Sequence, residues 1–88
     1  MKTREVEIDG LKFEIKAWTV KDRKNFLQEL QTISGFPPTE QYDSIIAFLA
    51  EQTAKSIEEI EDMDTIIADK LLDGIIKANT APLGPQRT

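Results

Sequence analysis

The sequence contains no cysteine and no histidine. Without cysteine there are no disulfides, thiolate nucleophiles or thiolate metal ligands, and without histidine the commonest proton-transfer group near neutral pH is missing. The four glycines are scattered along the chain, so no glycine-rich phosphate loop is formed. We therefore expect neither an enzyme nor a bound cofactor.

Long apolar runs are also missing. The longest covers residues 45–50, whereas a helix that crosses a bilayer needs about 20 apolar residues. The charged residues at the N-terminus are not followed by an apolar segment, which is not the pattern of a secretory signal. These features predict a cytoplasmic protein without a membrane-spanning helix.

A calcium loop is the one metal site that the acidic residues suggest, because Asp62 and Asp64 have the spacing of its first two ligands. Such a loop would need an oxygen ligand where Ile66 stands and a glycine where Ile67 stands. The loop is therefore excluded. We expect these carboxylates to cap helices or face solvent, with no metal bound.

Charge is unevenly distributed along the chain. Residues 1–38 carry seven Lys or Arg against six Asp or Glu, whereas residues 39–78 carry three against ten. Because affinity for nucleic acid comes largely from Lys and Arg, we expect no direct nucleic-acid binding. An acidic surface favours solubility, and it leaves open an alternative function as a small acidic inhibitor or DNA mimic that acts on a host protein.

The first structural element is a hairpin. Alternating apolar residues flank Asp9 and Gly10, the pair typical of a two-residue type I′ turn. Residues 3–17 are therefore predicted to form two antiparallel strands, with Val6 opposite Phe13 on a buried face. On the same face, Ile8 pairs with Leu11; on the opposite, solvated face, Glu7 pairs with Lys12.

From Trp18 onward the apolar period changes to that of a helix, and we expect the Trp18 ring to anchor the hairpin against the first helix. Helices are predicted over residues 20–34, 39–54 and 65–78, with a short helical turn over 57–61. Each has a residue suited to the N-cap position at or before its start: Thr19, Thr39, Ser56, and either Asp62 or Asp64.

These elements make one α+β domain over residues 1–78, an antiparallel hairpin followed by a small bundle of three to four helices. Residues 79–88 contain two prolines and no periodic pattern, and are predicted to be a flexible tail.

The second and last predicted helices have wide apolar faces, of about 200° and 180°, whereas packing on one core needs a stripe of about 100°. Such surplus apolar surface is typical of a module that binds a partner helix or a second copy. We therefore name as candidate partner-binding residues Phe36, Tyr42, Ile46, Leu72 and Ile76.

Two short stretches resemble a known family. Residues 12–22, K-F-E-I-K-A-W-T-V-K-D, in which a strand enters a capped helix through an aromatic, are similar to the opening of small bacteriophage tail assembly chaperones. Residues 56–64, S-I-E-E-I-E-D-M-D, are similar to the capped acidic turn that precedes the last helix of those proteins.

The resemblance implies a protein of the infected host's cytoplasm that binds the aggregation-prone tape measure protein and keeps it soluble while tail tube subunits polymerise around it. It implies self-association and absence from the mature virion, with the tail tube protein as a second candidate partner. A chaperone of the baseplate hub is a related alternative.

Overall fold

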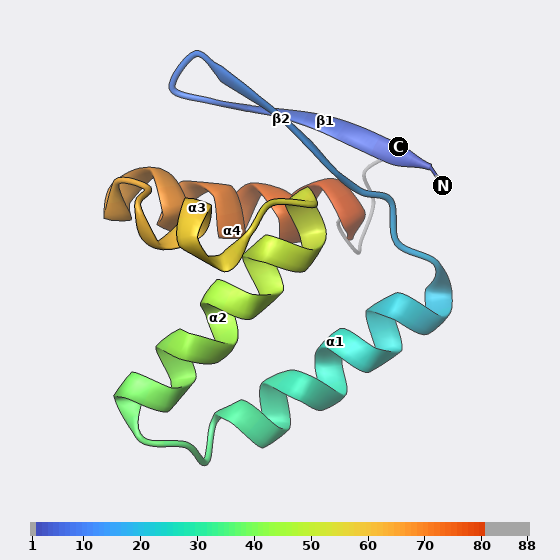
Figure 1. The fold of residues 1–88 in the computed structure, drawn as a ribbon. Helices are drawn as coiled ribbons and strands as arrows, with labels where there is room; N and C mark the ends of the chain where they lie inside the picture. Colours follow the sequence, from blue (N-terminus) through green and yellow to red (C-terminus); the bar gives the residue numbers. More distant parts are fainter. Residues whose placement is uncertain (1, 81–88) are drawn as a thin grey trace.

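The computed structural model describes residues 2–80 and contains a two-stranded antiparallel sheet followed by four helices (Figure 1). This is the α+β arrangement predicted from the sequence. The strands are β1 (Thr3–Ile8) and β2 (Leu11–Lys16), and the helices are α1 (Val20–Ile33), α2 (Pro38–Thr53), α3 (Ile57–Glu61) and α4 (Thr65–Asn79).

The hairpin has the predicted turn and register. Asp9 and Gly10 both have positive φ, 50° and 85°, as a type I′ turn requires. Val6 pairs with Phe13 and Ile8 with Leu11, as expected. Leu11 nevertheless remains 53% exposed, whereas its partner Ile8 is buried.

The hydrophobic core lies where the hairpin crosses α4 and the C-terminal half of α2 (Figure 1). The largest fully buried side chains are Ile15, Leu49, Leu71 and Ile75, contributed by β2, α2 and α4. Because burial of apolar surface is the main favourable term in folding, this contact between hairpin and helices holds the domain together.

The predicted helix starts are confirmed at three of four sites. Thr19 and Ser56 each accept a hydrogen bond in a capping box, and Asp64 caps α4. The prediction of Thr39 as the cap of α2 is wrong.

α2 instead begins at Pro38, with Pro37 at the N-cap position and no side-chain cap. Proline suits the first position of a helix, where its missing N–H would have no partner in any case. Pro37 has φ −59° and ψ 155°, the extended geometry imposed on a residue that precedes proline.

α4 ends at Asn79, the residue at which the sequence placed the start of a tail. Residues 81–88 lie outside the described part of the chain. Within residues 2–80, no helix has both the length and the apolar character that a bilayer crossing demands.

Candidate functional site

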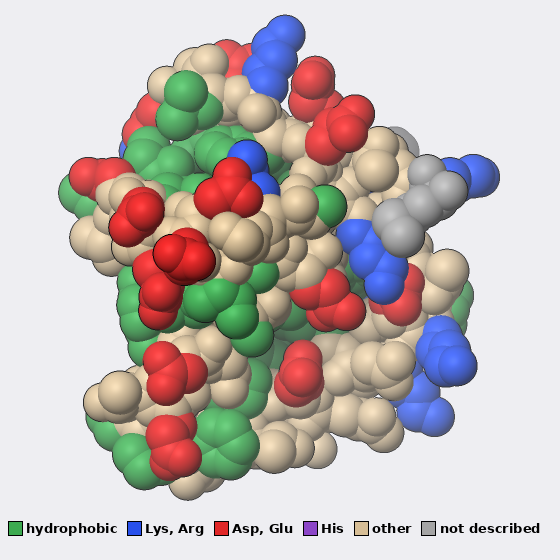
Figure 2. Space-filling model, viewed as in Figure 1, with side chains coloured by type: hydrophobic (Ala, Val, Ile, Leu, Met, Phe, Trp, Pro, Cys, Tyr) green, Lys and Arg blue, Asp and Glu red, His purple; other side chains and the backbone are tan. Residues whose placement is uncertain are grey.

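An apolar hollow of about 280 Å³ opens between α1, α2 and α4. Figure 2 shows apolar side chains in the recess between the two lower helices, α1 and α2. We call this surface the interhelical groove. Its apolar lining residues are Phe26, Leu30 and Ile33 from α1, Ile45 and Phe48 from α2, and Leu72 and Ile76 from α4.

The groove exists because α1 is amphipathic but has little to pack against. Phe26, Leu30 and Ile33 are spaced four and three residues apart and therefore share one face of the helix. No residue of α1 is buried, and Leu30 is 47% exposed. The apolar face of α1 is thus turned toward α2 and α4 and is only partly covered by them.

Three aromatic rings fix the distance between α1 and α2 at one end of the groove. The Trp18 ring centre lies 4.9 Å from that of Phe26 and 6.1 Å from that of Phe48, and the two phenylalanine rings are 5.5 Å apart. These separations are typical of favourable aromatic pairs. The Trp18 Nε1–H also donates to Oε1 of the buried Gln52, at 2.6 Å.

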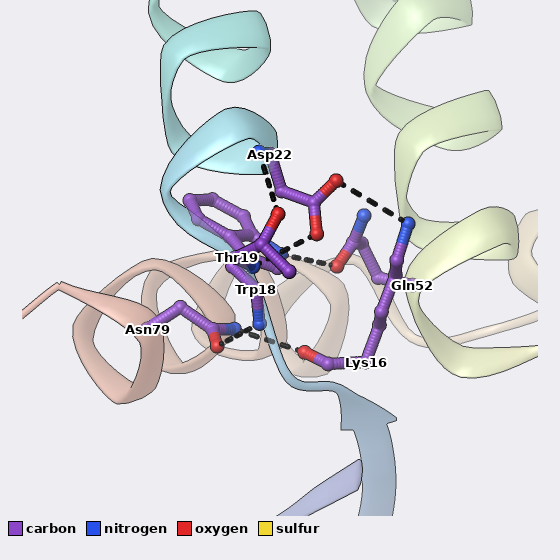
Figure 3. A network of polar contacts seen from close by, with 6 residues as sticks. All are labelled: Lys16, Trp18, Thr19, Asp22, Gln52 and Asn79. Atoms are coloured by element: carbon purple, nitrogen blue, oxygen red, sulfur yellow. Dashed lines mark hydrogen bonds and ion pairs between the residues drawn. The ribbon is translucent and has the colours of Figure 1, made fainter. Parts of the chain in front are cut away.

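Asn79 ties the start of α1 to the hairpin and to α4 (Figure 3). Its Oδ1 accepts from the backbone N–H of Trp18 at 2.9 Å and from Nε of Arg4 at 3.0 Å. Its Nδ2 donates to the backbone oxygens of Lys16 and Ile75, both at 3.1 Å. One amide therefore satisfies backbone groups where the chain leaves the sheet.

The first turn of α1 is closed by Thr19 and Asp22 (Figure 3). The backbone N–H of Thr19 donates to the Asp22 carboxylate at 2.9 Å, which is the main reason that the pKa of Asp22 lies below its ordinary value. Lys16 lies 3.7 Å from the same carboxylate and lowers its pKa further. A carboxylate held ionised in this way stabilises a helix start and is poorly suited to proton transfer.

The acidic segment before α4 also has structural roles. Glu59 accepts from the backbone N–H of Ser56 at 2.9 Å, which lowers the pKa of Glu59, and Asp64 accepts from Ile66 and Ile67. Among residues 2–80 there is no group of three or more potential metal ligands. These carboxylates act as helix caps.

Two carboxylates that do not cap helices, Glu29 and Glu51, lie along the groove. Glu29 lines the interhelical groove, and both Glu29 and Glu51 line its polar extension beside the aromatic rings. Neither has a Lys or Arg within 4.0 Å among the described residues, whereas Lys16 in the same extension is paired with Asp22. The rim of the groove is therefore acidic and unneutralised.

A second hollow, of about 330 Å³, lies on the other side of α2. Tyr42, Ile46 and Met63 give it apolar walls, and Glu61 and Asp69 stand at its edge. We call it the acidic hollow. The Tyr42 hydroxyl lies 3.3 Å from Oγ1 of Thr65, which links α2 to the start of α4.

The structure does not bring the predicted partner-binding residues together. Leu72 and Ile76 line the interhelical groove, whereas Tyr42 and Ile46 line the acidic hollow. Phe36 lines neither surface; it lies at the corner between α1 and α2 and is 37% exposed.

The sequence prediction missed the contribution of α1. The helix over residues 20–34 was predicted, but Phe26, Leu30 and Ile33 were not among the candidate partner-binding residues. The order of the elements could have indicated that this face stays partly exposed. The hairpin before α1 is too small to cover the apolar face of α1, and only α2 follows α1 directly.

No protein-family model, curated protein or solved structure matches this chain.

Proposed function

We propose that this chain is a non-catalytic protein-binding domain whose interhelical groove takes an amphipathic helix of another protein. The observation that carries the proposal is the partly exposed apolar face of α1, held open against α2 and α4. A helix laid into such a groove buries its own apolar stripe and the groove lining together.

The charge on the rim indicates the chemistry of that helix. Glu29 and Glu51 lack cationic partners among residues 2–80, and like charges brought near them would be repelled. A bound helix should therefore carry Lys or Arg beside its apolar stripe. Acidic helices should be rejected.

In biological terms, we propose a tail assembly chaperone that holds the tape measure protein soluble in the cytoplasm of an infected bacterium. This rests on the resemblance of residues 12–22 and 56–64 to that family and agrees with a groove for a client helix. The baseplate hub remains the alternative client. An acidic inhibitor or DNA mimic is less favoured, because Asp22, Glu59 and Asp64 serve as helix caps.

Two synthetic helical peptides test the groove, both with the same leucine stripe, one flanked by lysines and one by glutamates. The lysine peptide can form two ion pairs, with Glu29 and Glu51, that the glutamate peptide cannot form. At ~0.5 kcal/mol for each pair, the lysine peptide should bind about fivefold more tightly than the glutamate peptide. Leu30→Asp should abolish this binding. Leu27→Asp is the matched control, because Leu27 is 54% exposed on the same helix but lies outside the groove. Equal effects of the two variants would refute the groove.

Co-expression with the tape measure protein of the same genome tests the client separately. The wild-type chain should raise the amount of tape measure protein in the soluble fraction, and the Leu30→Asp variant should not. If the lysine peptide binds but the tape measure protein stays insoluble, the groove stands and the client assignment is wrong.

A further inference from the structure

A further hollow, of about 470 Å³, lies where the start of α1 meets β1 and the end of α4. Figure 1 shows these three segments near one another at the right of the molecule. We call it the basic hollow, because Arg4, Arg23 and Lys77 line it and no Asp or Glu does. In Figure 2, Lys and Arg side chains gather toward the same side of the molecule. Three elements that are far apart in the sequence thus bring cations to one place.

Two of these cations have no anionic partner. Arg23 is half-buried and Arg4 is exposed, and neither has a carboxylate within 4.0 Å among residues 2–80. The Nε of Arg4 donates to Oδ1 of Asn79 at 3.0 Å, which holds the guanidinium beside the end of α4. Lys77, by contrast, lies 2.9 Å from Asp73. The basic hollow therefore offers two guanidinium groups to an added anion.

Apolar surface lies in the same hollow. Val20 lines it together with the half-buried Trp18. Val20 is 89% exposed, the highest value among the large apolar side chains of the described residues, so its side chain contributes little to the stability of the domain. A ligand that fits the basic hollow therefore combines negative charge with an apolar group.

The carboxylates of a protein segment fit the basic hollow better than the phosphates of a nucleic acid. A carboxylate is planar and accepts two parallel hydrogen bonds from one guanidinium. The whole chain has a net charge of −5, so a nucleic-acid strand that extends past the hollow would meet acidic surface and be repelled. A short segment ends within the hollow. Because the cations stand on different elements and not in a row along one helix, a flexible segment can reach both guanidinium groups.

We propose that the basic hollow binds a short acidic segment of another protein, in which carboxylates pair with Arg4 and Arg23 and an apolar side chain covers Val20. The hollow and the polar extension of the interhelical groove both include Trp18, but two unpaired glutamates line the extension. The two surfaces therefore select binding partners of opposite charge. The inference does not depend on what occupies the groove.

Fluorescence anisotropy with a labelled synthetic peptide tests the proposal on the full chain. The peptide has a central leucine between two pairs of aspartates, and a proline on each side of the leucine prevents it from entering the groove as a helix. The wild type should bind this peptide, with an affinity that falls as NaCl is added. A peptide with asparagine in place of each aspartate should bind at least about tenfold more weakly.

Charge reversal at neighbouring positions of α1 locates the binding surface. Arg23→Glu removes one ion pair and adds a repulsive charge, and it should lower the affinity for the acidic peptide about tenfold. Lys24→Glu is the matched control, because it makes the same charge change at the next residue, which does not line the basic hollow; it should lower the affinity less than about twofold. Circular dichroism shows whether both variants fold. If Arg23→Glu does not fold, Arg4→Gln on the hairpin decides, with an expected loss of about threefold.

Three results would overturn the proposal. Equal losses for Arg23→Glu and Lys24→Glu would show a general effect of charge. Tighter binding of a short oligothymidine strand than of the acidic peptide would show that the hollow takes phosphates. Association between copies that Arg23→Glu abolishes, measured by sedimentation velocity, would make the acidic partner a second copy. Leu30→Asp should leave the binding of the acidic peptide unchanged, so a failure of this surface is distinguishable from a failure of the interhelical groove.

Discussion

α1 and α4 are helices of nearly equal length, 14 and 15 residues, but they are held in opposite ways. α4 is covered by the hairpin and by α2, and it buries Ala68, Leu71 and Ile75. α1 buries no residue and is fixed mainly at its first turns. Stability is therefore concentrated in one helix and available binding surface in the other.

Truncating the same residue type in the two helices should show the difference most clearly. Leu71 is fully buried, so Leu71→Ala removes core contacts and leaves a cavity. We expect a loss of about 2–5 kcal/mol in the free energy of unfolding, measured by urea denaturation. A loss below about 1 kcal/mol would contradict the placement of the core around α4.

Removing the amide of Asn79 should have the next largest effect, because it joins the two regions. Asn79→Ala leaves the backbone N–H of Trp18 and the carbonyl oxygen of Lys16 without their partner. Unsatisfied, partly buried groups cost about 1–3 kcal/mol. Asn25→Ala is the control, since Asn25 is exposed on α1; equal losses in the same urea measurement would show that the Asn79 network is unimportant.

How well the sequence predicts a feature depends on whether the feature arises from neighbouring residues or from residues far apart in the chain. The hairpin and the boundaries of α1, α3 and α4 were predictable, because they depend on local sequence rules. Examples are the turn at Asp9 and Gly10 and the N-caps at Thr19 and Ser56. The hydrogen bonds of Asn79 were not predictable, because its partners Trp18 and Lys16 lie 61 and 63 residues away in the sequence.

The candidate site was predicted only in part for a related reason. Leu72 and Ile76 were chosen because their helix has a wide apolar face, which is a local property. Leu30 of α1 belongs to the same surface because α2 and α4 leave part of α1 uncovered. This is a property of the tertiary structure, which the periodicity of the sequence does not predict.

Thr19→Ala tests how firmly α1 is attached at its start. The Thr19 hydroxyl accepts from the backbone N–H of Asp22 at 3.2 Å. Loss of an N-cap of this kind costs about 1 kcal/mol. An unchanged thermal midpoint would mean that the first turn of α1 contributes nothing to the cooperative fold.

Acid should weaken the same turn. Asp22 has a pKa below its ordinary value of 3.8 in the folded chain, so its stabilising contribution is present above that pH and is lost as pH falls through the lower, folded value. Asp22→Asn should therefore flatten the decline of stability in this range. Urea denaturation from pH 5 to pH 2 measures it, and identical slopes would contradict the assignment.

The smallest effect on folding is expected at Leu30, where function and stability should separate. Leu30 is 47% exposed on a helix without buried residues, and alanine is the better helix former. Leu30→Ala should therefore change the free energy of unfolding by no more than about 0.5 kcal/mol, against the loss of several kcal/mol expected for Leu71→Ala. The same change truncates a side chain that lines the interhelical groove, and it should lower the affinity for the lysine peptide about tenfold. If Leu30→Ala destabilises the fold as much as Leu71→Ala does, α1 belongs to the core, and the contrast between the two helices is wrong.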